Sequence, residues 1–262
     1  MSQSQLYKFT IITVCLNIAS TIRRTCESIV NQTFQDFQWI VVDGASTDGT
    51  LDILKEYSSR INILISEPDK GIYNAMNKGI KLATGEYINF MNGGDEFFNN
   101  EVLQKVVDAK PTADVIYGDE YKVKGEKKYL FKNWESVTPE LLYQRYGIAH
   151  QSSFTKTIVL KKYGFNENYK ISADYDFFLK ICKKGYSFCK IPITVNIFYE
   201  DGISINQQQL TEQEYLKIKK NNFKTIHFLN EHPSIASTVE FIRNSLKHPR
   251  FFAGWIKGKL KV

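Results

Sequence analysis

The fold is decided by the segment Gln38-Trp-Ile-Val-Val-Asp-Gly-Ala-Ser-Thr-Asp-Gly-Thr50, in which an apolar run passes directly into a polar loop. A short apolar run without polar alternation is typical of a parallel strand that helices cover on both faces. The loop contains two glycines and predicts a turn into a short helix over residues 51–57, with Thr50 as its N-cap. A strand, a polar loop and a helix in this order predict an α/β architecture.

The same unit recurs on both sides of that segment. Further strands are predicted at residues 9–16, 61–65, 86–91 and 114–117, and further helices at 20–31, 72–83 and 101–108. Strands and helices that alternate at this spacing predict a doubly wound, mostly parallel sheet flanked by helices. Because ligands bind such sheets at the carboxyl ends of the strands, the polar loops at 43–50, 68–71 and 92–95 are expected to form one site.

The regular alternation stops after about residue 120. Residues 122–132 predict a charged hairpin with Gly125 at its tip, residues 174–182 a helix, residues 186–198 a strand-rich stretch, and residues 207–229 a helix rich in Lys and Glu. We expect this less regular part to determine which ligand is recognised, because specificity resides in the site and not in the fold.

Composition excludes several classes of protein. The chain has 262 residues, of which 43% are hydrophobic, so it can bury a sizeable core. No apolar run approaches the roughly 20 residues that span a bilayer. Four cysteines without metal-ligand spacing indicate reduced thiols. Lys and Arg number 34 against 28 Asp and Glu, but residues 243–262 hold six basic residues and no acid. The remainder is neutral, so no nucleic-acid partner is expected.

The familiar phosphate-binding and hydrolase motifs are absent from the sequence. It has no G-x-G-x-x-G after its first strand, no G-x-x-x-x-G-K-[ST] and no G-x-S-x-G. The predicted strand ends instead carry Asp43, Asp48, Asp69 and Asp95. Carboxylates hold a diphosphate only through a cation such as Mg²⁺ or Mn²⁺, although they also bind ribose hydroxyls directly. These acids therefore point to a nucleoside-diphosphate ligand with a divalent ion.

Four features, in order along the chain, carry a resemblance to a known family. They are Thr13-Val-Cys-Leu-Asn17, the segment 42–50, the segment 69–79 together with 85–95, and His150-Gln-Ser with Ala173-Asp174. Over about residues 8–205 the chain resembles family 2 glycosyltransferases with the GT-A fold, of the kind that builds bacterial cell-surface polysaccharides. The resemblance implies a GT-A-like domain over residues 1–205, with a nucleotide-sugar-binding half at 1–120 and an acceptor half at 121–205. For residues 206–262, which the resemblance does not cover, we expect a helical C-terminal extension with a basic amphipathic tail.

The resemblance also assigns roles to single residues. It implies that Asp43 contacts the nucleoside, that Asp95 is the metal carboxylate, and that Asp174 is the general base. Further contacts to the sugar donor are implied for Val14, Asn17, Lys70, Gly71, Asn74, Asn77, Gly93 and Gly94, and His150 and Gln151 are implied to line the donor and acceptor side. The chain departs from the family at three positions, because Gly44, Gly94 and Ala173 stand where a further acid is common.

The expected reaction is a hexosyl transfer by direct displacement, which inverts the anomeric centre. Such a reaction needs a base on the acceptor hydroxyl and a cation on the leaving diphosphate. The implied partners are a nucleotide-diphosphate sugar, with a UDP-sugar expected first, and a saccharide or lipid-linked saccharide acceptor. One alternative is a catalytically degenerate nucleotide-sugar-binding subunit of a polysaccharide assembly complex. Another is a sugar nucleotidyltransferase, although residues 17–24 lack the glycine-rich, basic signature expected of that class.

The basic tail suggests attachment to a membrane surface. Phe252, Trp255, Ile256 and Leu260 share one helical face, whereas Lys257, Lys259 and Lys261 lie off it. A helix with aromatic anchors on one side and lysines on the other can lie in an anionic membrane interface. We therefore expect a cytoplasmic protein that is peripheral on the inner face of the cell membrane. The alternative is that the tail packs on the body or in a dimer; the sequence gives no prediction of the oligomeric state.

Overall fold

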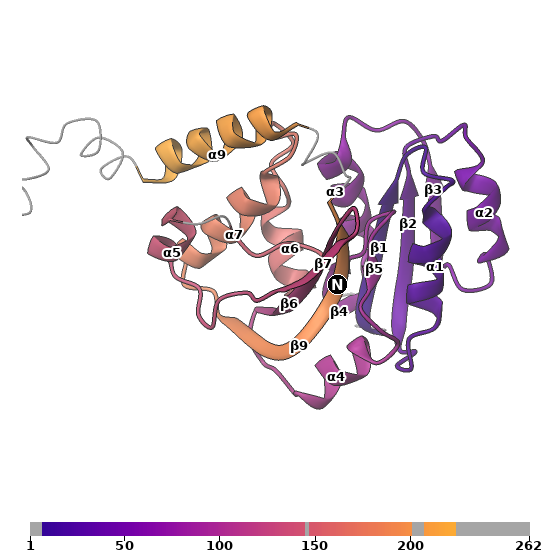
Figure 1. Ribbon diagram of the computed structural model, residues 1–262, viewed down its shortest axis with the longest axis horizontal. Helices are drawn as coiled ribbons and strands as arrows, with labels where there is room; N and C mark the ends of the chain where they lie inside the picture. Colours follow the sequence, from indigo (N-terminus) through magenta and orange to yellow (C-terminus); the bar gives the residue numbers. More distant parts are fainter. Residues whose placement is uncertain (1–6, 145–146, 201–206, 224–262) are drawn as a thin grey trace, which may run out of the picture. The chain divides into compact units, whose positions relative to one another are not determined.

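The computed structural model describes residues 7–144, 147–200 and 207–223 (Figure 1). One compact unit extends to Tyr215, and a second unit begins at Leu216. The helix α9 (Gln208–Asn222) begins in the first unit. The end of the predicted 207–229 helix and the tail at 243–262 lie outside the described residues.

The first half of the chain forms the predicted parallel sheet. Its elements are β1 (Tyr7–Cys15), α1 (Ile22–Val30), β2 (Phe37–Asp43), α2 (Thr50–Glu56), β3 (Ile63–Ser66), α3 (Ile72–Leu82) and β4 (Gly85–Phe90). The strands pair in parallel in the order β3-β2-β1-β4. Cys15 lies opposite Asp43, and Asp43 opposite Ser66, so β1, β2 and β3 end at one level. The loops that follow them therefore leave the sheet at one edge.

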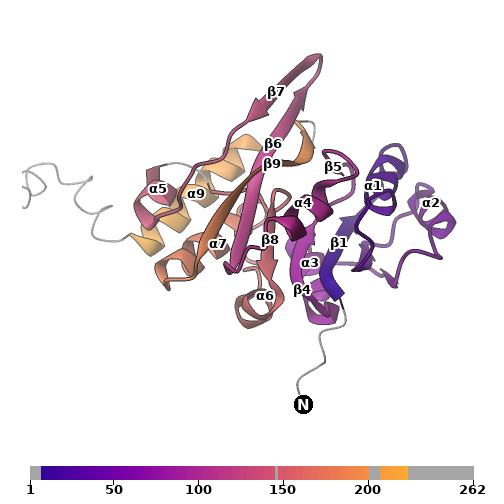
Figure 2. The ribbon, with the colours of Figure 1, turned by 90° about the horizontal axis from the view of Figure 1, so that it is seen from below.

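Burial explains why these residues form this sheet. Every residue of β2 is buried, and so is every residue of β1 from Phe9 on. Helices cover both faces, because α1 and α3 lie on opposite sides of β1 and β2 (Figures 1 and 2). The helix α1 turns its buried residues Ile22, Cys26 and Ile29 toward one side at helical spacing.

The second half of the chain extends the same sheet with both antiparallel and parallel pairs of strands. Its elements are β5 (Glu96–Phe97), α4 (Val102–Asp108), β6 (Val115–Lys124), β7 (Lys127–Phe131), α5 (Pro139–Gln144), β8 (Ser153–Lys156), α6 (Thr157–Tyr163), α7 (Ala173–Lys183) and β9 (Phe188–Tyr199). The sheet continues as β4-β8-β6-β9-β5. The strand β8 runs antiparallel to both β4 and β6, whereas β6 and β9 are parallel. Figure 2 shows the predicted charged hairpin as β6 and β7.

One expectation about a helix start is wrong. The helix α2 begins at Thr50, so Gly49 and not Thr50 is the N-cap. Gly49 has φ +97°, a left-handed conformation that glycine adopts without a steric penalty. The carboxylate of Asp48 accepts hydrogen bonds from the Thr50 backbone N–H at 3.0 Å and from its hydroxyl at 2.6 Å. The backbone N–H of Ala19 also donates to this carboxylate, at 2.8 Å, so Asp48 organises the loop. The hydrogen bond from Ala19, together with those from Thr50, holds the pKa of the Asp48 carboxyl below its usual range.

Candidate active site

The turn after β4 places Asp95 at the ligand edge of the sheet. The backbone N–H of Gly93 donates to the carbonyl of Val14 at 2.9 Å, which continues the pairing of β4 with β1. Gly94 turns the chain with φ +100°, a conformation that an L side chain would strain. The hydroxyl of Thr25, on α1, accepts from Gly94 N–H at 2.9 Å and donates to the Asp95 carbonyl at 2.6 Å. The turn is therefore fixed from both β1 and α1.

The carboxylate of Asp95 is buried and has one side-chain hydrogen-bond donor among the described residues. Only 8% of the residue is exposed, and the Gln151 amide donates to Oδ2 at 3.1 Å. Burial raises the pKa of Asp95 from 3.8 to about 7, against the opposing effects of the Gln151 hydrogen bond and the nearby His150 and Arg24. A bound cation would favour the ionised carboxylate and lower this pKa.

Asp174 lies in the first turn of α7 and faces a pocket. Its Oδ1 accepts from the backbone N–H of Tyr175 at 2.8 Å, and the Tyr73 hydroxyl lies 3.2 Å away. That hydroxyl also contacts the carbonyl of Ile171 at 2.5 Å, so its single proton is shared between the two oxygens. In the described part of the chain, the single hydrogen bond to Oδ2 comes from Nδ1 of His150, at 2.9 Å. With 18% of the Asp174 side chain exposed, Oδ2 can accept one more hydrogen bond, from a bound hydroxyl.

Two consecutive residues connect the two acids. His150 contacts Asp174 through Nδ1, and Gln151 contacts Asp95 through its side-chain amide. Nε2 of His150 lies 2.9 Å from the amide nitrogen of Asn92. Because that nitrogen is a donor, Nε2 is the acceptor and the ring proton resides on Nδ1. The predicted His150–Gln151 segment therefore lies between Asp174 and Asp95.

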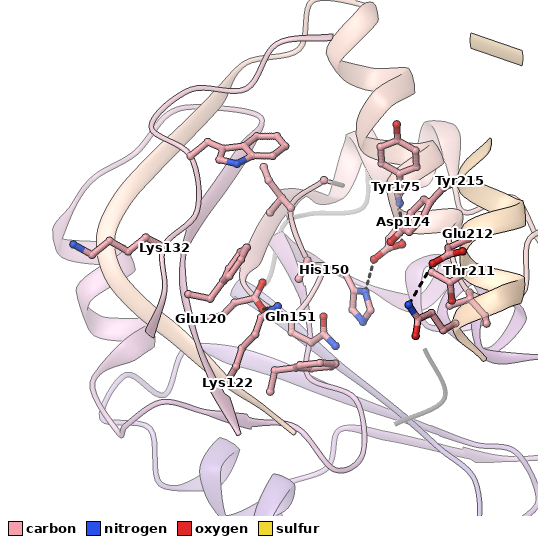
Figure 3. A pocket seen from close by; sticks show the side chains of 18 of the residues that line it. Glu120, Lys122, Lys132, His150, Gln151, Asp174, Tyr175, Thr211, Glu212 and Tyr215 are labelled. Atoms are coloured by element: carbon pink, nitrogen blue, oxygen red, sulfur yellow. Dashed lines mark hydrogen bonds and ion pairs between the residues drawn. The ribbon is translucent and has the colours of Figure 1, made fainter. Parts of the chain in front are cut away.

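A pocket of about 730 Å³ opens beside Asp174 and His150 (Figure 3). In Figure 3, Glu120 and Lys122 form one wall, and Asp174 with the α9 residues Thr211 and Tyr215 forms the other. Asp95 is not among the lining residues, whereas Asp174 is. The pocket therefore belongs to the side of the site that holds the candidate base.

The predicted nucleoside contact Asp43 is fully buried at the end of β2. Its carboxylate accepts from the backbone N–H of Ser46 at 2.9 Å, from the hydroxyl of Ser46 at 2.5 Å and from the hydroxyl of Ser66 at 2.7 Å. Asn17 holds the same loop, because its Oδ1 accepts from Thr47 N–H at 2.9 Å. These contacts order the loop at 43–50 from β1, β2 and β3 together.

The loop at 43–50 meets the next predicted loop at Gly44. A Cβ at position 44 would lie 2.8 Å from Oδ2 of Asp69. The other oxygen of Asp69 accepts from Gly71 N–H at 2.7 Å. The carboxylate of Asp69 therefore occupies the space that a side chain at position 44 would need, and the two loops converge as predicted.

Three of the residues predicted to contact the sugar donor lie on α3 or on the turn before it. The Asn74 and Asn77 amides donate to the two oxygens of Glu167 at 2.9 and 2.8 Å, and Asn77 also pairs with the backbone of Phe165. These bonds tie α3 to the segment that precedes α7. Lys70 is exposed on the turn before α3.

Three functional candidates were missed from the sequence. Tyr73 lies inside a quoted motif, so a buried hydroxyl could have been suspected there. Glu120 follows the predicted strand 114–117 and could have been found as another acid at a strand end. Glu214 of α9 accepts the backbone N–H groups of residues 170, 171 and 172 at 2.6, 3.0 and 2.9 Å. No sequence signal marks Glu214, because its role depends on how α9 packs.

The donor atoms near Asp95 fit a hard divalent cation. Within the described ranges, no group of three or more His, Cys, Asp or Glu side chains could hold a metal ion. Mg²⁺ needs fewer protein ligands, since it is usually bound through one or two carboxylates together with substrate phosphates and water. Besides the buried carboxylate of Asp95, the turn carries the amide oxygen of Asn92, which is buried without a hydrogen-bond partner. Asp95 is therefore the residue that would hold Mg²⁺ or Mn²⁺.

Comparison with known proteins identifies the family. Residues 10–182 match the model of the family described as Glycosyl transferase family 2. The chain belongs to glycosyl transferase family 2. A PGL/p-HBAD biosynthesis glycosyltransferase of Mycobacterium tuberculosis is 33% identical to this family 2 chain over 178 residues, which cover 64% of this chain and 67% of that protein. The chondroitin synthase of Escherichia coli is 27% identical over 233 residues, 82% of this chain but 34% of that protein.

Solved structures confirm the GT-A fold of this family 2 member. The crystal structure of S. aureus TarS 1–349 in complex with UDP-GlcNAc matches with a TM-score of 0.68 at 20% identity, covering 85% of this chain and 67% of that chain. Mannosyltransferase PcManGT from Pyrobaculum calidifontis, in complex with GDP-Man and Mn²⁺, matches with a TM-score of 0.58 at 17% identity. The match covers 97% of this chain and 84% of that chain. In the part of the chain that the structure describes, no helix has the length and apolar character needed to cross a membrane.

Proposed function

We propose that this family 2 glycosyltransferase moves a hexosyl group, with inversion, from a nucleotide-diphosphate sugar to a saccharide or lipid-linked saccharide. The observation that carries the proposal is the arrangement of two acids, Asp95 and Asp174, which the adjacent residues Gln151 and His150 hold on two sides of one site. The TarS and PcManGT complexes with UDP-GlcNAc and GDP-Man support a nucleotide sugar as the donor, with a UDP-sugar expected first.

The general base in this proposal is Asp174. As the acceptor oxygen forms a bond to the anomeric carbon, Oδ2 of Asp174 takes the hydroxyl proton, and the electron pair of the breaking bond leaves with the nucleoside diphosphate. A single displacement of this kind inverts the configuration. The hydrogen bonds from His150 and from Tyr175 N–H keep the carboxylate oriented during the proton transfer.

Asp95 would hold Mg²⁺ or Mn²⁺ on the sugar-donor diphosphate. When bound, the cation supplies Lewis-acid stabilisation of the negative charge on the leaving group. The Mn²⁺ in the PcManGT complex supports a divalent ion for this chain. The loops at 43–50 and 68–71 converge beside the same sheet edge and are the proposed nucleotide side, with Asp43, Asn17 and Val14 shaping it.

Neither alternative is favoured over transfer. A degenerate binding subunit needs no oriented base, yet Asp174 is held by His150 and faces an open pocket. The family match disfavours a nucleotidyltransferase. We also propose a domain boundary at 205/206, a cytoplasmic location, and peripheral attachment to the membrane through residues 243–262.

A ligand screen tests the proposed function. We expect UDP-sugars, more than GDP- or dTDP-sugars, to raise the melting temperature of the full chain, and to do so more strongly with Mn²⁺, because binding to the folded state stabilises it by mass action. We also expect slow, Mn²⁺-dependent hydrolysis of the UDP-sugar, measured as release of UDP. The proposal is contradicted if no nucleotide sugar shifts the melting temperature with or without the ion.

A further inference from the structure

The pocket beside Asp174 contains a buried carboxylate for which the proposed mechanism has no use. Glu120 of β6 has 4% of its side chain exposed. Its Oε1 accepts a hydrogen bond of 3.3 Å from Ser152, and its Oε2 lies 3.8 Å from Nζ of Lys122, beyond hydrogen-bond distance. An ionised carboxylate offers about four acceptor positions, and the described residues leave most of them without a donor. Burying a charge with so little compensation is costly, which indicates that a ligand supplies the missing donors.

Lys122 supplies a hydrogen-bond donor near this carboxylate, and its ammonium group lies over two aromatic rings. Its Nζ lies 4.1 Å from the ring centre of Phe131 and 5.7 Å from that of Phe198. Its side chain is 21% exposed, so the ammonium group can reach the pocket. A fixed acceptor, a fixed donor and apolar rings suit a pyranose, which has hydroxyls at its rim and C–H groups on its faces.

The charges around the pocket favour an uncharged sugar. The described residues that line it include three lysines, Lys122, Lys124 and Lys132, and three carboxylates, Glu120, Asp174 and Glu212. Lys124 also pairs with Glu200 at 3.4 Å. These residues supply no excess of positive charge for a uronate or a phosphorylated sugar.

We propose that Glu120 and Lys122 bind the hydroxyl groups of an uncharged pyranose of the acceptor. The assignment to the acceptor rests on the proposed function, because Asp174, the proposed base, lines this pocket and Asp95, the proposed metal carboxylate, does not. Figure 3 shows the two residues on the wall opposite Asp174, with His150 and Gln151 between them. A sugar bound there presents one hydroxyl to Asp174 while others contact Glu120 and Lys122.

The test measures binding of simple sugars to the full chain by NMR titration in the presence of UDP and Mn²⁺. The probes are methyl β-glucopyranoside, methyl β-galactopyranoside and the matched methyl β-glucuronide. The variants are Glu120→Gln and Lys122→Met, with Glu126→Gln and Lys128→Met as controls at exposed positions of the same hairpin. We expect at least one neutral glycoside to bind more tightly than the glucuronide. Glu120→Gln and Lys122→Met should each weaken the binding of that glycoside at least tenfold, and the two control variants should leave its binding unchanged.

A parallel titration of UDP with Mn²⁺ separates this inference from the proposed function. We expect every variant to bind UDP within twofold of the original chain. Among the described residues Glu120 makes one side-chain hydrogen bond of 3.3 Å, and Gln has the same shape, so Glu120→Gln is expected to keep the original melting temperature, and a loss of glycoside binding then does not come from unfolding. Neutral glycosides that fail to bind, or bind Glu120→Gln and Lys122→Met normally, overturn the inference even where UDP binds. A glucuronide preferred over the glucoside also overturns it, whereas failure of UDP to bind contradicts the proposed function alone.

Discussion

At the scale of single residues, His150 is the side chain that orients the proposed base. It donates to Oδ2 of Asp174 at 2.9 Å. A hydrogen bond to a charged group contributes about 1.5–3 kcal/mol, so we expect His150→Ala to lower kcat by about 10- to 100-fold with little change in sugar-donor affinity. His150→Asn, whose amide nitrogen can replace Nδ1, should recover part of that loss. Equal turnover for the Ala and Asn variants would contradict an orienting role.

The raised pKa of Asp95 makes a prediction about stability. Between pH 3.8 and about 7 the folded protein retains a proton that the unfolded chain has lost, so the free energy of unfolding falls as pH rises. The slope from this group is at most about 1.4 kcal/mol per pH unit. In urea unfolding, the free energy of unfolding of Asp95→Asn should therefore rise relative to that of the original chain from pH 4 to 7. Above pH 7 the difference between the two should stay constant. The exposed control Asp108→Asn should show no such trend. If the stability of Asp95→Asn instead changed with pH in parallel with that of the original chain, the raised pKa of Asp95 would be refuted.

Some site residues could be predicted from the sequence and others could not. Asp95, Asp174, His150 and Gln151 were expected together, and hydrogen bonds connect them. Glu120 lies on a strand that continues seven residues past its predicted end, so its direction into a pocket could not be read from the pattern. Asn74 and Asn77 match the family motif, yet their amides bind Glu167, a contact that depends on the packing of α3.

At the scale of elements, α9 supports the helix that carries the base. Glu214 accepts three backbone N–H groups from residues 170–172, directly before α7. We expect Glu214→Ala to lower the free energy of unfolding by about 3 kcal/mol, because it leaves buried donors without a partner. Glu212, which is exposed on the same helix, is the matched control, and Glu212→Ala should lower the free energy of unfolding by less than about 0.5 kcal/mol. Urea unfolding decides the prediction, and equal losses in the two variants would count against this contact.

The elements also show which parts of the fold the sequence predicts. The strands β1 and β2 are buried on both faces, so a continuous apolar run was a sufficient signal. The strand β8 has only four residues, Ser-Phe-Thr-Lys, and is buried because it fits between β4 and β6. Its position depends on partners distant in sequence, which single-chain periodicity cannot supply.

At the scale of the whole molecule, the charge distribution predicts a reversible membrane contact. The six basic residues of 243–262 lie outside the described part of the chain, and the rest of the sequence is neutral. Each basic residue near an anionic leaflet contributes roughly 1 kcal/mol, and salt screens this attraction. We expect the full chain to float with anionic liposomes at low salt, and to lose binding in high salt or after deletion of 243–262. Absence of liposome binding at low salt, or binding that survives the deletion, would disprove a membrane contact through residues 243–262.

The division of labour between Asp95 and Asp174 is the central claim of this account. It is tested most directly by calorimetric titration of the nucleotide-sugar donor with Mn²⁺, alongside sugar transfer, in Asp95→Ala and Asp174→Asn. We predict that Asp95→Ala loses metal-dependent binding of the sugar donor. Asp174→Asn should bind the donor normally and lose transfer by on the order of 10² to 10⁴. Unchanged metal-linked binding in Asp95→Ala, or near-normal transfer in Asp174→Asn, would contradict the claim.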